Sequence, residues 1–466
     1  MTNLLILFST AITVLFVGLM KRREWLAPLA ASGTLLCIAL TAAQLAGMEV
    51  FHWNERFSSM LRFDRFADAF TMVVLVSFLL MLGLTGYGLR KVQETLGDYL
   101  GLIIFSLCGA LCLFAFENLV MLFLGIEILS IPLYILAGSR RNDLAGNEAA
   151  LKYYIMGAFT TGVFLFGVAL VYGATGSFGL QIIADKIAAG TYSPALLNTG
   201  IALMTIGLCF KISAVPFHFW APDVYEGSPN LVTVFMATVV KTAAIAAFYR
   251  LFFHALAPVH EVWGTTLAVI SALTMTLANV TAIFQTNFKR MMAYSSISHA
   301  GFLLLGILSV GVPGSGGALL FYTIAYAVAT ICAFGIFILV SEQQDDKWTF
   351  KAFNGLGKTQ PFLAAVMAIC MLSLAGVPPA AGFFGKYFLF AAAFEQYPWL
   401  IMLAIANSAI SIYYYFRVIN AMYFTKQKPS VERLETPAAY RWVMWVGLLL
   451  LAALAVMPGD VYGLLP

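Results

Sequence analysis

Residues 205–241 read TIGLCFKISAVPFHFWAPDVYEGSPNLVTVFMATVVK, and this stretch decides the class of fold. Lys211 and Lys241 each lie inside an otherwise apolar run. A lysine at the centre of a bilayer costs roughly 2.5–3.5 kcal/mol on insertion scales, so two in one short stretch are hard to explain as packing. Between them a proline in the segment 213–216 interrupts the helical pattern, and His218 follows. Because a broken membrane helix is tolerated where protein or a water-filled cavity covers the freed backbone groups, the stretch predicts a path for ions or protons.

The composition is that of a polytopic helical membrane protein. Of 466 residues, 61% are hydrophobic and 10% are charged, against about 25% charged in soluble domains. The mean hydropathy is +0.90. The net charge of +4 is spread over the loops and gives no argument for a nucleic-acid partner. The six cysteines lie in apolar runs without a CxxC pair, which favours packing roles over a disulfide, a haem or an iron–sulfur cluster.

Apolar runs of spanning length predict about fourteen transmembrane helices. The twelfth is too long for one straight crossing and contains Gly376, Pro378 and Pro379, so we expect it to be broken. Before the seventh, residues 178–190 form an amphipathic stretch that is too short to span and is expected in the outer interface. The expected spans are 4–20, 26–47, 66–88, 99–116, 118–138, 151–175, 197–220, 230–253, 260–284, 292–311, 316–341, 361–395, 398–424 and 438–457.

The distribution of lysine and arginine predicts the orientation. Loops after odd-numbered spans hold sixteen basic residues and loops after even-numbered spans hold five. Since basic residues concentrate on the cytoplasmic side, we expect the odd loops inside and both termini outside. The loop after span seven breaks this rule, because it carries Asp223 and Glu226 and no basic residue. The five residues assigned to outer loops are Arg56, Arg62, Arg65, Lys186 and Arg250.

Two Val-Pro breaks indicate an internal repeat. AVPFHFW at 214–220 and GVPPAAGFFGKY at 376–387 lie in spans seven and twelve, five spans apart. Five-helix units inserted with opposite topology would relate the two breaks by a pseudo-two-fold axis in the membrane plane. We therefore expect one transmembrane domain over 1–466. Its parts are helices 1–3 in 1–95, repeat one in 96–255, repeat two in 256–425 and helix 14 in 426–466.

Ionisable side chains within the apolar spans are the candidate functional residues. Glu127 lies near the middle of span five, Lys241 near the middle of span eight, and Lys386 seven residues after Pro379. Burial favours the neutral forms of lysine and glutamate, and a nearby opposite charge favours the charged forms. Glu127 beside Lys211 would switch between a paired, charged state and a separated state in which the lysine loses its proton. The competing interpretations are snorkelling lysines and a structural hydrogen bond from Glu127.

Two histidines extend this set. His218 follows the first break, and His299 lies in span ten within AYSSISHAGF, after Tyr294 and three serines. Histidine titrates near neutral pH and exchanges protons at either ring nitrogen, so both are candidate relay residues. A hydrogen-bonded packing role is the alternative. In span thirteen, Asn407 and residues 413–415 are expected to continue the path.

These motifs resemble the antiporter-like membrane subunits of respiratory complex I, the NADH:quinone oxidoreductase. FLGIEILSIPLYILAG with NEAALKYYIMGAF is similar to the family's fifth and sixth helices, and FKISAVPFHFWAPDVYEGSP to its broken seventh helix. KRMMAYSSISHAGFLLLG resembles the tenth helix and LAGVPPAAGFFGKYFLF the broken twelfth. Four matches in the same order at similar spacing make the resemblance specific. It covers spans four to thirteen, whereas 1–95 and 425–466 carry little of it.

The resemblance implies an all-α polytopic membrane fold of fourteen helices with two inverted five-helix repeats and broken helices 7 and 12. It implies that Glu127, Lys211, Lys241 and Lys386 are proton-channel residues, with His299 between the half-channels. The chain itself would hold no cofactor. NADH, FMN, iron–sulfur clusters and quinone are expected in partners, the other membrane and peripheral subunits of complex I. The expected location is the cell inner membrane rather than that of an organelle.

Other functions share this membrane core. One is a subunit of a multi-subunit cation/proton antiporter, which has no redox partner. Another is a subunit of a ferredoxin- or hydrogenase-linked relative of complex I. A purely structural role would hold if neutral substitutions at the charged positions left pumping intact. Neighbouring genes distinguish a complex I subunit from an antiporter subunit, because flavin and iron–sulfur subunits accompany complex I and small antiporter subunits accompany an antiporter.

Overall fold

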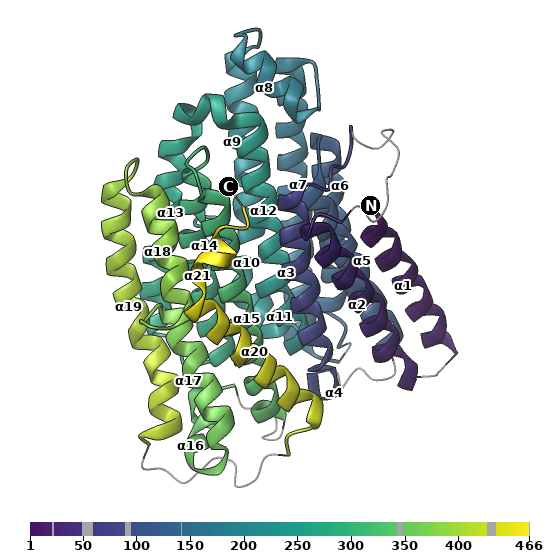
Figure 1. Ribbon diagram of the computed structural model, residues 1–466, viewed down its shortest axis with the longest axis vertical. Coiled ribbons are helices and arrows are strands. Elements are labelled where there is room, and N and C mark those ends of the chain that lie inside the picture. Colours follow the sequence, from purple (N-terminus) through teal and green to yellow (C-terminus); the bar gives the residue numbers. More distant parts are fainter. Residues whose placement is uncertain are drawn as a thin grey trace.

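A computed structural model describes residues 1–20, 23–48, 59–88, 95–140, 142–342, 348–425 and 435–465. In these ranges the chain is almost entirely helical, and long helices lie side by side along the longest axis (Figure 1). Twelve helical stretches of the described part are long and apolar enough to cross a membrane. One of them, Asn230–Ile283, has 54 residues and is divided by a 3-10 turn at Ala257–Val259, so it makes two crossings. The two shorter apolar helices Pro361–Ala375 and Ala381–Ala393 together form one further crossing. With the double crossing of Asn230–Ile283, the described part accounts for all fourteen predicted spans.

The helices follow the predicted order. The N-terminal group comprises α1 (Thr2–Leu19), α2 (Leu26–Leu45), α3 (Arg65–Leu82) and the short α4 (Thr85–Gly88). The next group comprises α5 (Leu96–Ala115), α6 (Leu119–Ala137), α7 (Leu144–Thr175), α8 (Leu180–Ala188), α9 (Pro194–Ile212), α10 (Trp220–Gly227), α11 (Asn230–Phe235) and α12 (Lys241–Leu251). The last comprises α13 (His260–Ile283), α14 (Phe288–Leu308), α15 (Ser315–Glu342), α16 (Leu356–Thr359), α17 (Pro361–Ala375), α18 (Ala381–Ala393), α19 (Pro398–Tyr423), α20 (Ala438–Val456) and α21 (Pro458–Tyr462).

Burial identifies the centre of the bundle. The apolar windows of α14 and α15 are each 94% buried, and that of Asn230–Ile283 is 100% buried. In contrast, α1 is 22% buried and α19 is 39% buried, and these two helices lie at opposite edges of the bundle (Figure 1). A helix that is apolar all round belongs in the interior. The elements that carry Lys241 and His299 are therefore the most enclosed part of the molecule.

The seventh and twelfth spans are broken, as predicted. α9 is followed by Ser213 at φ 63°, and α17 is followed by Gly376 at φ 79°. At both breaks the next amide, of Ala214 or Val377, donates back to the carbonyl five residues earlier, at 2.8 and 3.1 Å. This left-handed cap satisfies helix carbonyls that would otherwise have no partner. Matching caps are what an internal repeat predicts, but the repeat limits at 96–255 and 256–425 stay a prediction.

Several boundaries differ from the expectation. α7 begins at Leu144 rather than 151, because the carboxylate of Asp143 accepts hydrogen bonds from two amides of its first turn. The seventh span ends as a helix at Ile212 and resumes at Trp220 as α10. A π-helical turn at Met236–Val240, which the sequence did not predict, separates α11 from α12. The short amphipathic helix is confirmed as α8, although its place in the interface stays a prediction.

The assignment of Arg250 to an outer loop is wrong. It lies in the last turn of α12, and its side chain is fully buried. Nη1 is 2.8 Å from Asp64 and Nη2 is 2.7 Å from Glu117, while Nε donates to the Phe116 carbonyl at 2.9 Å. The two carboxylates come from turns far away in sequence, before α3 and between α5 and α6, and they make the burial of the guanidinium tolerable.

The predicted orientation is not decided by this structure. Many of the basic loop residues on which it depends lie outside the described residues. They are Lys21, Arg22, Arg56, Arg90, Lys91, Arg141, Lys347, Lys426, Lys428 and Arg433. The placement of both termini outside therefore stays a prediction.

The acidic segment after the first break is neutralised by neighbouring helices. Asp223 forms ion pairs with Lys152 of α7 at 2.7 Å and with Arg290 of α14 at 2.9 Å. Glu226 pairs with the same Arg290 at 2.7 Å, and its backbone carbonyl accepts from Lys289 at 2.7 Å. The segment has no basic residue of its own because α7 and α14 supply them, which explains the exception to the charge rule.

The Asp223 pairs predict a pH-dependent contribution to stability. Burial raises the pKa of Asp223, but hydrogen bonds and charges from Lys152 and Arg290 lower it by more, so it lies below the usual 3.8. A lowered folded-state pKa stabilises the fold above pH 3.8, and this stabilisation is lost as pH falls through the folded-state value. Asp223→Asn should cost about 1 kcal/mol or less at pH 7, because the pairs are partly exposed.

Thermal unfolding in detergent at a series of pH values measures this effect. The difference between Asp223→Asn and the parent protein should shrink as the pH falls below the ordinary aspartate pKa. The exposed Glu395→Gln is the matched control and should show little difference at neutral pH. A difference that stays constant over the whole acid range would contradict the ion-pair explanation.

Candidate functional site

Lys211 lies in the last turn of α9 and is held by hydroxyl groups. Its side chain is buried, and Nζ donates to Ser130 Oγ at 2.9 Å and to Tyr134 OH at 3.3 Å. Both partners belong to α6, one turn apart, on either side of Pro132. Ser130 Oγ also donates to the carbonyl of Ile126, one turn earlier in the same helix, at 2.6 Å. The ammonium group therefore has neutral partners from a neighbouring helix.

Glu127 and Lys211 form no ion pair in this structure. Among the ion pairs of the described residues, none involves Glu127. Its Oε1 atom is buried without a hydrogen-bond partner among those residues. Leu124 and Ile131, on the same side of α6, are 41% and 50% exposed, so Glu127 borders the outward face of the helix. The predicted ion pair between Glu127 and Lys211 is therefore not formed in this structure, and the switch between them stays a prediction.

Lys241 is enclosed at the centre of the bundle, directly after the π-helical turn. Its side chain is 2% exposed, and Nζ donates to both the hydroxyl and the backbone carbonyl of Ser296 on α14. Ser296 Oγ also accepts from Tyr326 OH of α15 at 2.9 Å. Such burial excludes snorkelling to a membrane interface. π-helical turns occur frequently at functional sites.

His299 lies between two tyrosine hydroxyls. Its Nδ1 is 2.5 Å from Tyr322 OH of α15, and its Nε2 is 3.0 Å from Tyr415 OH of α19. Tyr415 OH is also hydrogen-bonded to Ser295 Oγ. Both ring nitrogens are therefore engaged with groups that can either donate or accept. Lys241 and Lys386 lie within electrostatic range of the ring.

Lys386 lies in α18, after the second break. Nζ donates to the carbonyl of Ala375, the last residue of α17, at 2.8 Å, and to Ser408 Oγ of α19 at 2.6 Å. The C-terminal end of a helix favours a cation. The positive φ of Gly376 favours glycine, and a Cβ there would come within 2.7 Å of the Lys386 side chain and displace it. Nζ also lies 4.6 Å above the ring of Phe302.

His218 is not brought into this network. It lies in the first break, with its ring 4.5 Å from that of Phe219, which is 69% exposed. Its Nδ1 is buried and has no hydrogen-bond partner among the described residues. The structure therefore gives no direct contact between His218 and the three lysines, and its relay role stays a prediction.

Sequence reasoning missed the hydroxyl groups that surround the lysines. The detectable signal was spacing, because Ser130 and Tyr134, and likewise Tyr322 and Tyr326, are four residues apart in apolar helices and share a face. In span thirteen, Tyr413 is 59% exposed and does not face the path. The other residues expected in this span, Asn407, Tyr414 and Tyr415, are buried and face inward. Asn279 Oδ1 accepts from Tyr414 OH at 2.9 Å, and its amide donates to Asn407 Oδ1 at 3.1 Å.

Aromatic rings lie next to these hydrogen-bonded groups. From Tyr134 beside Lys211, rings continue through Tyr153 at 4.8 Å to Trp220 at 4.7 Å between centroids. On the other side, Phe302 lies between His299, 6.3 Å away between centroids, and Lys386. Within each cluster, protons can pass along hydroxyl, imidazole and amine groups. Between clusters, they need water or a movement of the rings.

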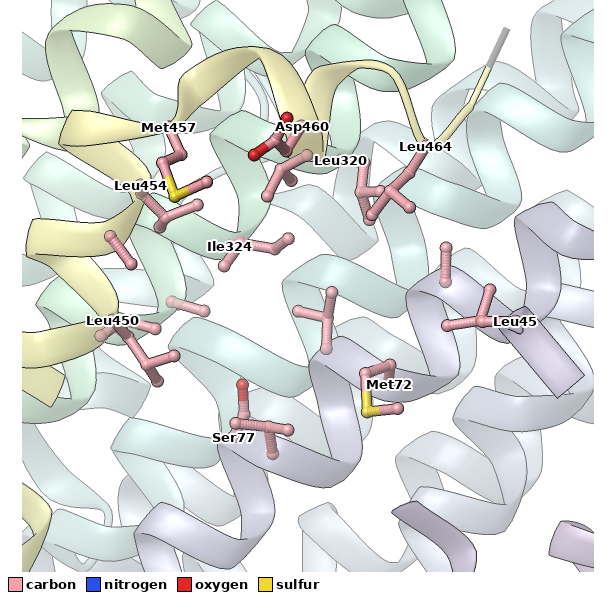
Figure 2. Close-up of a pocket in the computed structure, with 17 residues that line it drawn as sticks. Leu45, Met72, Ser77, Leu320, Ile324, Leu450, Leu454, Met457, Asp460 and Leu464 are labelled. Atoms are coloured by element: carbon pink, nitrogen blue, oxygen red, sulfur yellow. The ribbon is translucent and has the colours of Figure 1, made fainter. Parts of the chain in front are cut away.

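One apolar cavity lies apart from the site. It has a volume of about 370 Å³ and is formed mainly by α3, α15, α20 and α21. Figure 2 shows its lining of leucine, isoleucine and methionine side chains, with Ser77 and Asp460 as labelled polar residues. None of the candidate relay residues lines it. Among the described residues, no group of three or more His, Cys, Asp or Glu side chains could hold a metal ion.

Comparisons with known proteins agree with the fold and the motifs. The family model described as "NADH:quinone oxidoreductase/Mrp antiporter, TM" matches residues 117–411. NADH-quinone oxidoreductase subunit N of Flavobacterium johnsoniae is 39% identical, with all of both chains covered. The same-named protein of Chloroflexus aggregans is 41% identical over 93% of this chain and 88% of its own.

Solved structures show the same similarity. A chain of respiratory complex I from Thermus thermophilus is 33% identical with a TM-score of 0.84, covering 99% of this chain and 98% of that one. A chain of an archaeal membrane-bound sulfane sulfur reductase is 26% identical with a TM-score of 0.87, covering 99% and 95%. A chain of the Mrp complex from Dietzia is 18% identical with a TM-score of 0.85, covering 100% and 96%, which shows the fold alone.

Proposed function

The chain belongs to the NADH:quinone oxidoreductase/Mrp antiporter family of membrane proteins, and from this premise we propose how its buried charges move protons. It is a proton-translocating membrane-arm subunit of a bacterial NADH:quinone oxidoreductase, and it works with the other membrane and peripheral subunits of that complex. The antiporter alternative is not favoured, because two relatives matched over their full length, at 37% and 39% identity, and a third, 43% identical over 83% of each chain, are named as subunit N.

Three buried lysines without a carboxylate partner carry the proposal. Lys211, Lys241 and Lys386 each donate to hydroxyl or carbonyl oxygens, and none forms an ion pair among the described residues. A fixed counterion would hold a buried ammonium in its charged form. With neutral partners, the free energies of the protonated and neutral forms are closer, so a change in a nearby charge moves the proton.

Glu127 and Lys211 form the switching element of this proposal. When the carboxylate approaches, pairing stabilises protonated Lys211. When it withdraws, this stabilisation is lost, and the proton can pass toward Lys241. Coupling of this kind requires an element with two states that both sites bias, and we assign this role to Glu127 and Lys211. Lys241, His299 and Lys386 then continue the path through the second half of the chain.

The remaining features of the proposal follow from the predicted topology. We propose two inverted repeats, 96–255 and 256–425, with both termini on the periplasmic side of the inner membrane. The chain would hold no redox centre of its own, and NADH, FMN, iron–sulfur clusters and quinone would be bound by partner subunits. Its task would be to couple distant quinone reduction to proton movement. The matching helix caps at Ser213 and Gly376 support the repeat.

Lys386→Ala tests the second half of this path. The substitution removes the amine that bonds Ser408 and Ala375, so proton transfer beyond His299 should fail. Coupled NADH:quinone turnover in membrane vesicles should fall by about tenfold or more, since a positioned proton-transfer group contributes roughly 10²–10⁴-fold. The exposed Lys358→Ala is the control and should retain turnover. An assembled Lys386→Ala complex with normal turnover and pumping would make Lys386 a structural group.

A further inference from the structure

The hydrogen bonds around His299 form a continuous row of groups that exchange protons. In order, the row is Ser295 Oγ, Tyr415 OH, His299 Nε2, His299 Nδ1 and Tyr322 OH. All four side chains are buried. They come from three helices: α14 supplies Ser295 and His299, α15 supplies Tyr322, and α19 supplies Tyr415. No aromatic ring or carbon side chain interrupts the row.

We propose that Tyr415 and Tyr322 are proton-relay residues, one on each side of the His299 ring, and that Ser295 delivers protons to Tyr415. The proposal rests on the proposed function and specifies how a proton crosses its central histidine. It assigns the crossing to hydroxyl groups on helices α15 and α19, which approach opposite ring nitrogens. It also makes α19, an edge helix of the bundle, part of the path through its inward side.

The proposed transfer conserves the number of protons on the row. The Ser295 hydroxyl gives its proton to the Tyr415 oxygen while it accepts one from the incoming side, and Tyr415 gives its own proton to His299 Nε2. The proton on Nδ1 leaves to the Tyr322 oxygen, which passes its own proton onward. One proton enters and one leaves, each hydroxyl ends with one proton, and the imidazole ends neutral with its proton on the other nitrogen. Rotation of the proton-bearing ring restores the starting state without returning the proton along the row.

A purely structural role for the two tyrosines predicts a different pattern of hydrogen bonds. If the tyrosines only fixed the histidine ring, one hydrogen bond at each nitrogen would be enough, and Tyr415 would need no further hydrogen bond to Ser295. The actual Tyr415 hydroxyl has two partners, one on each side along the row. Such a hydroxyl can accept a proton from one group while it donates to another. This double engagement is the observation that favours transfer over positioning.

Four single substitutions in the complete complex test the relay. Tyr415→Phe and Ser295→Ala each remove one hydroxyl of the row, and coupled NADH:quinone turnover should fall about tenfold or more. Ser295→Thr keeps the hydroxyl and should retain most of the turnover. Tyr440→Phe is the matched control. It lies on α20, is equally buried and loses a 3.0 Å hydrogen bond to the Leu84 carbonyl, so it reports the cost of such a loss outside the row.

Two further readouts separate transfer from folding and from the proposed function. Electron input, measured with an artificial acceptor, should stay normal in all four variants, which shows that the complex is assembled. Normal proton-to-electron ratios and turnover in Tyr415→Phe, or equal losses in Ser295→Ala and Ser295→Thr, would overturn the relay. If Lys386→Ala pumps normally as well, the second half of the proposed proton path also fails. If Lys386→Ala is impaired while the hydroxyl variants are normal, the relay alone is wrong.

Discussion

Lys241→Met should remove most of the coupled NADH:quinone turnover while the complex still assembles. The side chain is 2% exposed, and its Nζ is the donor to both oxygen atoms of Ser296. Methionine has similar length and no proton to transfer. The loss of one proton-transfer group corresponds to roughly 10²–10⁴-fold in the rate of that step. Replacing a buried charge by an apolar side chain of similar volume is often neutral for stability, so turnover should change far more than assembly.

Activity assays in inverted membrane vesicles measure this effect. Turnover with quinone and with an artificial electron acceptor should be compared in the same preparation, so that loss of coupling is separated from loss of the complex. Lys186→Met is the control, because Lys186 is exposed on α8. Full quinone turnover in an assembled Lys241→Met complex would show that protons pass without this amine.

Arg250→Met is expected to give the largest loss of stability. The guanidinium is fully buried, and its removal leaves Asp64 and Glu117 without their shared cation. Breaking a buried ion pair by deleting one partner costs about 3–5 kcal/mol. The two carboxylates are 25% and 19% exposed, so water compensates in part and the lower end of that range is expected. Asp64 also caps α3, so the loss should spread to the packing of that helix.

The thermal unfolding temperature of the detergent-solubilised chain measures the Arg250 effect. Arg65→Met is the matched control, since Arg65 is next to Asp64 but exposed, and it should change stability little. Adding Asp64→Asn and Glu117→Gln to Arg250→Met should recover part of the loss, because the unpaired charges disappear. Equal unfolding temperatures for Arg250→Met and Arg65→Met would show that the ion pairs contribute nothing.

The spans and both breaks could be predicted because they depend on local composition. A run of apolar residues long enough to cross a bilayer has few alternatives to a helix. Gly376 with its prolines, and Pro216 after Ser213, mark positions where helical hydrogen bonding must stop. Lys211, Lys241 and Lys386 were conspicuous for the same reason, since each is a charge within an apolar run.

The remaining features depend on contacts between distant segments. Arg250 read as a loop residue because its counterions lie 186 and 133 positions away in the chain. The π-helical turn before Lys241 has no sequence signature that we could recognise. Tyrosines in membrane helices are common, so only tertiary packing shows that Tyr322 and Tyr415 meet His299 from opposite sides. The absence of an ion pair between Glu127 and Lys211 likewise depends on packing between helices, which the sequence does not show.

The number of protons translocated per electron in an assembled Glu127→Gln, Lys241→Met complex tests the central claim most directly. The claim is that buried amines and carboxylates of this chain carry protons. The measurement compares proton movement with electron flow in sealed vesicles, using the residual turnover of the variant and the parent complex at the same electron flux. If these side chains carry protons, the number of protons translocated per electron should be lower in the variant. A ratio equal to that of the parent complex would contradict it.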